Sequence, residues 1–246
     1  MSALQYIKHQ DIDLIKWDYT ILHSQIPFVF AQSFYLNATC PNWDALVIGD
    51  YEAVFPITYK TKFGYRYLPQ PPFTSQLGAY GRVNLETEQQ FYNYVIEHFN
   101  LIDVELNVSN QLQSEFISKK NTYTLNYSEG YKFNQNTKRN IAKANENGFV
   151  VERVLNNEII MLSQKYLNPF LEKEVSLSKA TVSLLDNLLK NTDLAGQLYT
   201  FQVLDKNHTI KALGHFICNG KHALYLKGTN FDKADNSGSM HLLMKH

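Results

Sequence analysis

The stretch GQLYTFQVLDKNHTIKALGHFICNGKHALYLKGTNF, residues 196–231, decides the fold class. Three apolar runs of strand length follow one another with only short polar turns between them, which predicts three consecutive antiparallel strands. Asn219-Gly220 is the strongest hairpin signal of the chain, because both residues tolerate the positive φ of a type I′ turn. The loop DKADNSGS and the helical run MHLLMKH complete the order of strands, loop and helix.

The segment before these strands predicts helices around a single strand. FNQNTKRNIAKANENG indicates a basic helix that ends at Gly148, and FVVERVL indicates a strand. NEIIMLSQKYLNPFLE and SKATVSLLDNLLKNT then indicate two helices. From its strand onward, this half therefore has the order strand, two helices, three strands, loop, helix.

The sequence of the first half predicts the same order of helices and strands, although few residues are identical between the halves. LQYIKH indicates a strand, and DIDLIKWDYTILHSQ indicates a helix capped by Asp11, with apolar residues at helical spacing at Ile12, Ile15, Tyr19 and Leu22. Residues 27–43 indicate a second helical segment that ends near Pro41.

The period then changes from helical to alternating. DALVIGDYEAVFPITYK indicates two strands around a turn at Gly49 and Asp50, and KFGYRYLPQPPFTSQLGAYG indicates a third strand that breaks into a loop. LETEQQFYNYVIEHFN indicates a helix with one stripe made by Phe91, Tyr94, Val95 and Phe99. LIDVELNV and NTYTLNY indicate two further strands.

These orders predict an α+β protein of two modules, residues 1–130 and 131–246, each a mixed and mostly antiparallel sheet flanked by helices. The first half adds two strands after its last helix, whereas the second half stops inside that helix. We therefore expect the second module to be truncated at its C-terminus, or to take its last strands from elsewhere.

The bulk composition limits the classes of function. The 23 basic and 23 acidic residues balance, which argues against a broad electrostatic surface for nucleic acid or membrane, so an anion site has to be local. Cys40 and Cys218 belong to no metal-binding or disulfide pattern, and no run of 18 apolar residues occurs. We expect a cytoplasmic protein with free thiols, no metal and no membrane span.

The order of elements in each half resembles the GNAT acyltransferase fold. A chain that carries it twice resembles the FemAB family of peptidoglycan-type aminoacyltransferases and the related FemAB-like acetyltransferases. NTKRNIAKANENGFVVE resembles that family's basic helix at the start of the second module, and ALYLKGTNFDKADNSGSMHLL resembles the following strand, loop and helix start. YEAVFPITYKTKFGYRYLPQPPFTSQLG resembles the strands and proline-containing loop of the first module.

The resemblance implies an N-acyltransferase that moves an acetyl or aminoacyl group from a carrier to a small-molecule or peptide amine, without a covalent enzyme nucleophile. Acetyl-coenzyme A or another acyl-coenzyme A is slightly favoured as the carrier over aminoacyl-tRNA, because the net charge is zero. However, the loop has one glycine, Gly238, where a coenzyme-A-binding GNAT usually has Q/R-x-x-G-x-G/A. The alternatives are a non-catalytic GNAT-like module that binds a peptide or nucleotide-linked ligand, and a surface-interaction protein that uses the aromatic loop.

Three groups of residues are candidates for this chemistry. The catalytic candidates are a general base, a group that binds or deprotonates the ammonium and a strand residue beside the oxyanion: His215, Asp232 (with Asp235) and Tyr225. The carrier candidates are strand backbone, small residues before a helix and basic residues: Leu226, Lys227, Gly228, Ser237, Gly238, Ser239, Lys138, Arg139 and Lys143. The acceptor candidates come from the aromatic loop: Tyr65, Arg66, Tyr67 and Gln70.

Each candidate also has a purely structural interpretation. His215 fits a satisfied core histidine on a strand, and the serines fit an ordinary helix cap. The basic helix fits a solvated surface, and the aromatic loop residues fit a staple that ties an irregular loop to the core.

Overall fold

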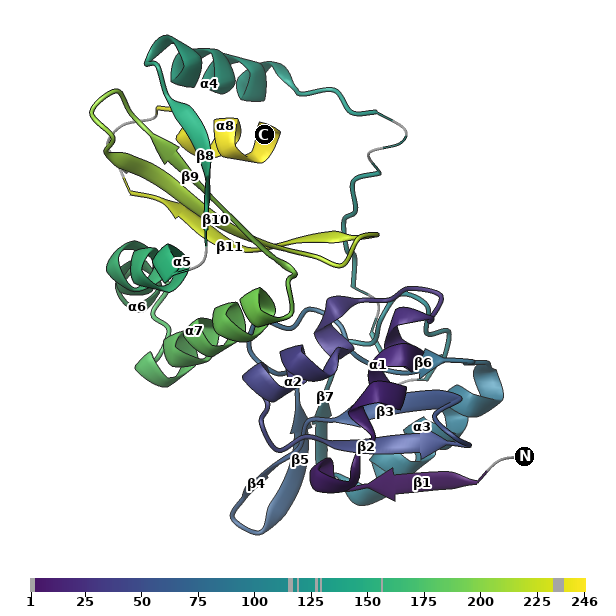
Figure 1. The fold of residues 1–246 in the computed structure, drawn as a ribbon. Helices are drawn as coiled ribbons and strands as arrows, with labels where there is room; N and C mark the ends of the chain where they lie inside the picture. The colour runs from purple at the N-terminus through teal and green to yellow at the C-terminus, as the bar shows by residue number, and fades with distance from the viewer. Residues whose placement is uncertain are drawn as a thin grey trace. The chain divides into compact units, whose positions relative to one another are not determined.

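The computed structural model describes residues 3–114, 117–118, 120–126, 128, 130–155, 157–231 and 237–246. It has helices packed on several small sheets, as Figure 1 shows, and the chain divides into two compact units. The first unit contains Met1–Ser114 together with Ser183–Thr192, and the second contains Glu115–Val182 together with Asp193–His246.

The first unit contains two sheets. β1 (Leu4–Ile7), β2 (Asp44–Ile48), β3 (Ala53–Ile57) and β6 (Tyr80–Gly81) pair antiparallel in the order β1-β2-β3-β6. β4 (Lys60–Lys62), β5 (Tyr65–Pro69) and β7 (Leu101–Asp103) form a second sheet, in which β5 and β7 are parallel. The third predicted strand therefore leaves its two predecessors and joins another sheet.

Helix α3 (Leu85–His98) supplies the core of the first unit. Its side chains Phe91 and Val95, and Phe99 just after it, are buried against apolar residues of β2 and β3, so the predicted stripe is confirmed at these positions. Tyr94 lies at the margin of this core and stacks on Tyr6 at 5.7 Å.

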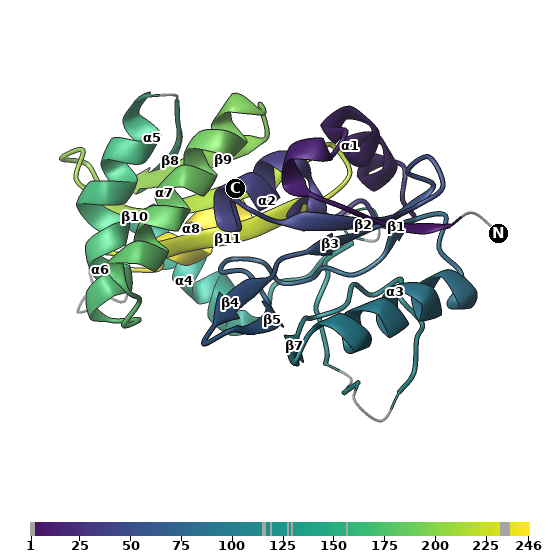
Figure 2. The same ribbon diagram turned by 90° about the horizontal axis from the view of Figure 1, so that it is seen from below.

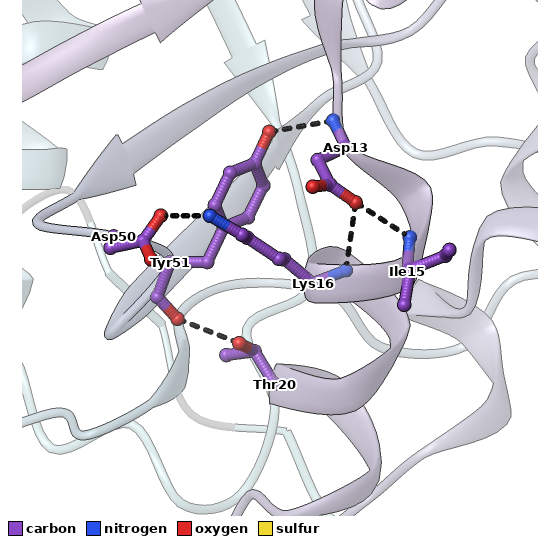
Figure 3. A network of polar contacts seen from close by, with 6 residues as sticks. All are labelled: Asp13, Ile15, Lys16, Thr20, Asp50 and Tyr51. Carbon is purple, nitrogen blue, oxygen red and sulfur yellow. Dashed lines mark hydrogen bonds and ion pairs between the residues drawn. The ribbon is translucent and has the colours of Figure 1, made fainter.

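Helix α1 (Leu14–Leu22) begins later than predicted, because His9–Asp11 form a 3₁₀ turn ahead of it. The cap is Asp13 and not Asp11: its carboxylate accepts the backbone N–H groups of Ile15 and Lys16, both at 3.1 Å (Figure 3).

The buried face of α1 also differs from the predicted stripe. Trp17, Thr20 and Ile21 are buried, whereas Ile15 is 85% exposed. Tyr19 and Leu22, also on the predicted stripe, are exposed as well. The spacing was helical, but the buried stripe runs along another side of the helix.

A turn residue fixes α1 to the sheet. The Tyr51 hydroxyl accepts the backbone N–H of Asp13 at 2.8 Å, and the Thr20 hydroxyl donates to the Tyr51 carbonyl at 2.6 Å (Figure 3). Lys16 pairs with Asp50 of the same turn at 2.5 Å. The turn between β2 and β3 therefore contacts the cap residue of α1 and two positions along the helix.

The remaining helices of the first half are short. α2 (Ser33–Thr39) follows a 3₁₀ turn at Val29–Ala31, as the segment before Pro41 predicts.

Trp17 and Trp43 are both fully buried and lie 4.6 Å apart between ring centroids.

The second unit is built on one antiparallel sheet. β8 (Val150–Val154), β9 (Leu198–Leu204), β10 (Ile210–Cys218) and β11 (Ala223–Asn230) pair in the order β11-β10-β9-β8. The three consecutive antiparallel strands predicted from residues 196–231 are confirmed.

Helices lie on both sides of this sheet. α4 (Gln135–Glu146) and α8 (Ser239–Lys245) pack on one face through Ile141, Ala144, Leu242 and Leu243. Figure 2 shows α5 (Asn157–Leu162) and α6 (Asn168–Lys173) on the other side, joined by the π-helical turn Ser163–Leu167. α7 (Lys179–Leu194) precedes β9.

Two local predictions were wrong. At the hairpin, the two loop residues are Gly220 and Lys221, because Cys218 pairs with Ala223 and the Asn219 N–H donates to the His222 carbonyl at 3.2 Å. Gly220 has φ +86° but Asn219 does not have positive φ, so the predicted type I′ turn at Asn219-Gly220 is not formed. Residues 121–126 form no strand, and Tyr123 is 93% exposed, so alternation there does not reflect a buried face. Tyr127 of that segment lies outside the described residues.

Within the described part of the chain, no helix has the length and apolarity needed to cross a membrane. In the same residues, no group of His, Cys, Asp or Glu side chains gathers in a way that could hold a metal ion. Cys40 and Cys218 are free thiols, and burial raises the pKa of Cys40 to about 11.

The cap of α1 gives a test of the fold at single-residue resolution. We expect Asp13→Ala to lower the free energy of unfolding by about 1 kcal/mol, because two backbone N–H groups lose their acceptor. Asp11→Ala, two residues earlier, removes the same charge without removing the cap and should stay within about 0.5 kcal/mol of wild type. Urea unfolding followed by circular dichroism measures both; equal losses would contradict this assignment of the cap.

Candidate functional site

The pairing of β10 with β11 is interrupted by a β-bulge. His215 is in register with Lys227 and Phe216 with Tyr225, which leaves Leu226 without a partner. β10 is the single neighbour of β11 among the described strands, so one edge of β11 keeps outward-facing backbone groups. A bulge at such an edge re-aims backbone and side chains and is over-represented next to active sites.

Two glycines face each other beside the bulge. Gly228 is in register with Gly214, and a Cβ at Gly228 would lie 2.4 Å from the carbonyl oxygen of Leu213. The Tyr225 hydroxyl would lie 2.8 Å from that same Cβ, so this hydroxyl sits directly over Gly228. The missing side chains leave a notch in the sheet, which the phenol of Tyr225 and the side chain of Leu243 from α8 fill.

Tyr225 is the one catalytic candidate that this notch includes. Its side chain is 40% exposed and its ring lies 5.3 Å from that of Phe216. Partial burial raises its pKa, so the phenol stays protonated at neutral pH and can donate a hydrogen bond.

His215 lies elsewhere. Adjacent strand residues point to opposite faces, so His215 and the Phe216–Tyr225 pair are on different sides of the sheet. The imidazole is fully buried; its Nδ1 lies 2.8 Å from the Thr200 hydroxyl and its Nε2 has no hydrogen-bond partner among the described residues. Burial lowers its pKa to about 3, which favours the structural interpretation of this residue over a general base.

The small-residue loop before α8 is covered. Ser237 and Ser239 are buried, and Gly238 has φ +76° with its Cα against α4: a Cβ there would lie 2.0 Å from the carbonyl oxygen of Asn140. The described part of the loop therefore leaves no space for a pyrophosphate. Asp232 and Asp235, the acidic candidates of this loop, lie outside the described residues.

The basic residues of α4 are on its outer side. Lys138, Arg139 and Lys143 are exposed, whereas Ile141 and Ala144 are buried against the sheet, as the helical wheel predicts. Of the three cations, Lys143 alone lines a pocket described next.

A surface pocket of about 360 Å³ lies where α4 ends. Its walls come from the end of α4, the turn into β8 and the hairpin between β9 and β10: Lys143, Asn147, Phe149, Asp205, Lys206, Asn207 and Lys211. Except for Lys143, sequence reasoning missed these residues. No spacing in the sequence indicates them, because the turn between β9 and β10 meets the end of α4 only in the folded sheet.

The acceptor candidates of the first unit do not converge. Tyr65 and Tyr67 lie on the opposite face of β5 from Arg66, because side chains alternate along a strand. Gln70 uses its amide within its own region: it donates to the Thr74 carbonyl and accepts the Glu105 N–H, both at 3.1 Å. The structure thus places Gln70 as a clamp of the proline-rich loop.

Arg66 belongs to a polar and aromatic cluster that the sequence did not predict. Its guanidinium lies over the rings of Tyr59 and Phe99 at 4.6 and 4.8 Å, and it donates to the Tyr6 hydroxyl at 3.0 Å. Tyr6 in turn donates to the buried carboxylate of Asp44.

Two further contacts hold that carboxylate. Lys8 Nζ lies 3.0 Å from Asp44 Oδ2, and the backbone N–H of His9 donates to Oδ1 at 2.8 Å. Burial and the neighbouring carboxylate raise the pKa of Tyr6, so its hydroxyl remains a donor.

The fold has a known counterpart. The crystal structure of FemX superimposes on the chain with a TM-score of 0.66, at 12% sequence identity, over 98% of this chain and 84% of that chain. The predicted FemAB-like, GNAT-type α+β fold is therefore confirmed. At this identity the similarity establishes the fold alone. No family model and no curated protein matches the sequence.

The covered loop leads to a prediction on Gly238. Gly238→Ala should lower the free energy of unfolding by about 3 kcal/mol or more, because the new methyl group is both in a left-handed conformation and against a backbone carbonyl. Gly196→Ala is the matched control: φ is +68° there but no atom lies within 4 Å, so the loss should be about 1–2 kcal/mol. Equal losses in thermal or urea unfolding would show that α4 does not cover this loop.

The burial of His215 predicts a pH dependence. Below pH 6.5 the unfolded chain gains a proton that the folded protein takes up only near pH 3, so stability falls as the pH drops through this window. Between pH 7 and pH 5 this amounts to about 2 kcal/mol. Urea unfolding of wild type and His215→Gln at both pH values measures it: the variant should lose less stability, by about that amount, than wild type. Identical losses would mean that His215 titrates normally.

Proposed function

We propose that the chain is an acyltransferase that forms an amide, and that it moves an aminoacyl group from an RNA ester to a small-molecule or peptide amine. The observation that supports this most is the β11 bulge with its glycine notch and Tyr225, set in a FemAB-like fold. An acyl chain lying along the outer edge of β11 would meet backbone donors there, as amide-forming chemistry requires. A cytoplasmic location, where aminoacylated RNA is made, belongs to the same proposal.

The proposed reaction needs little from side chains. The neutral amine attacks the ester carbonyl carbon, and the carbonyl electron pair moves to oxygen, where backbone N–H groups at the bulge stabilise the charge. The intermediate then expels the ribose oxygen as the C–O bond breaks. The Tyr225 phenol donates a hydrogen bond to that oxygen, and the proton lost by the attacking nitrogen neutralises the departing alkoxide.

The choice of carrier follows from the loop before α8. The sequence slightly favoured coenzyme A, whose pyrophosphate would need Ser237, Gly238 and Ser239 open to solvent. These residues lie under α4, which weighs against coenzyme A and supports an RNA ester as the donor. An acyl-coenzyme A donor remains the alternative that the assay below separates.

One observation supports a second function. His215 is buried and neutral, so the chain lacks its strongest side-chain candidate for a general base. A GNAT-like module that binds a peptide or a nucleotide-linked ligand without transfer would need no such base. Product formation distinguishes the two functions.

The test uses the full chain with two donors in parallel. An RNA minihelix carrying an aminoacyl ester, or acetyl-coenzyme A, is incubated with a lysine-containing peptide, and the amide product is measured by mass spectrometry. We expect product with the RNA ester and none with acetyl-coenzyme A. Product with acetyl-coenzyme A alone would contradict the assignment of RNA as the carrier. Binding of either donor without any product would support the binding module.

Tyr225 allows a sharper test. Tyr225→Phe should lower kcat/KM by about 100-fold, because one donor to the leaving oxygen is lost. Tyr123→Phe alters an almost fully exposed phenol and is the matched control. Wild-type kcat/KM in the Tyr225 variant would remove this residue from the mechanism.

A further inference from the structure

The pocket at the end of α4 carries an excess of positive charge. Lys143 comes from α4, and Lys206 and Lys211 come from the hairpin between β9 and β10, so three lysine side chains line one opening. Asp205 is the single carboxylate among the lining residues. The lining residues therefore carry a net charge of +2, in a chain whose overall charge is zero.

Asp205 does not neutralise all of this charge. Its Oδ1 accepts the backbone N–H groups of Asn207 and Thr209, both at 2.9 Å, and its Oδ2 lies 3.4 Å from Lys211 Nζ. Hydrogen bonds from Thr209 and Asn207, together with Lys211, lower the pKa of Asp205. The carboxylate thus shapes the hairpin and pairs with Lys211. Lys143 and Lys206 have no ion-pair partner within 4 Å in the described part of the chain.

The walls of the pocket are held in place by backbone structure. α4 ends in a tight turn, in which Phe149 N–H donates to the Ala144 carbonyl at 3.1 Å and Gly148 adopts φ +71°. A Cβ at Gly148 would lie 2.4 Å from Lys206 Cε, so the stem of Lys206 lies across this glycine.

The remaining wall has the chemistry of a nucleotide site. Phe149 packs against the core with one side and lines the pocket with the other. Aromatic faces stack on nucleic-acid bases, and the side-chain amides of Asn147 and Asn207 can donate to and accept from base edges. The pocket is an open depression on the surface, so a ligand larger than a lone phosphate ion has room in it.

We propose that this pocket binds one nucleotide of a single-stranded RNA segment, with Lys143 and Lys206 on the phosphate and Phe149 against the base. An acidic peptide would use the lysines but not the aromatic wall. The inference deepens the proposed function, since it names a contact for an RNA carrier, and it depends on that function only for the biological role of the contact.

The test is fluorescence anisotropy of a labelled RNA hairpin with a single-stranded 3′ end, titrated with the full chain over a series of salt concentrations. Each lysine–phosphate contact to a single strand contributes about 0.7 to the slope of log K against log salt. Lys143→Gln/Lys206→Gln should therefore reduce the slope by about 1.4, which is about 25-fold weaker binding at 0.1 M salt.

Two further variants complete the design. Lys173→Gln/Lys221→Gln removes the same charge from exposed lysines outside the pocket and should keep the wild-type slope. Phe149→Leu keeps an apolar core contact and should weaken binding without changing the slope, because stacking is not salt-dependent. Thermal unfolding confirms that each variant is folded.

A wild-type slope in the Lys143/Lys206 variant would overturn the proposal, as would an equal loss in the Lys173/Lys221 variant. Binding of coenzyme A at the pocket without binding of the RNA would also overturn it. The proposed function is tested separately, by formation of the amide product from the aminoacylated RNA minihelix. If no product forms while the salt slope of the Lys143/Lys206 variant falls as expected, the nucleotide site stands and the transferase proposal is wrong. If product forms while that slope is unchanged, the transferase proposal stands and the nucleotide site is wrong.

Discussion

The second unit depends on how closely α4 can approach its neighbours, and two glycines set that distance. Gly238 lets the Asn140 carbonyl of α4 reach the backbone before α8, and Gly148 lets the chain turn back at the end of α4 under the stem of Lys206. The helix can therefore bury Ile141 and Ala144 against the sheet. The same placement covers one potential anion site and builds the wall of another.

This arrangement connects the fold with the choice of carrier. In the proposed transfer the acyl group lies along β11, where the bulge at Leu226 and the paired glycines at 214 and 228 interrupt the regular ladder. The small-residue loop before α8 is covered by the middle of α4, whereas a cationic and aromatic pocket opens at the C-terminal end of the same helix. The two features together favour a carrier held through nucleotides over one held through a diphosphate.

The sequence predicted the order of helices and strands well, because the spacing of apolar residues along each segment indicates its secondary structure. The runs of residues 196–231 form the expected strands, and the stripe of α3 buries Phe91, Val95 and Phe99. The sequence-based predictions were wrong where tertiary contacts determine the local structure. Asp11 and Asp13 have equal capping propensity, and the 3₁₀ turn together with Tyr51 selects the second. The notch and the pocket join residues from separate strands and turns, so no spacing along the chain reveals them; the burial of His215 likewise depends on the packing around its strand.

Arg66 joins β5, in one sheet of the first unit, to Tyr6 on β1, in the other. Its guanidinium is held against flat rings above a buried carboxylate network, so the two sheets are fastened at a point where neither shares a backbone ladder with the other. Sliding of the β4–β5 hairpin against β1 would therefore have to break the hydrogen bond between Arg66 and Tyr6.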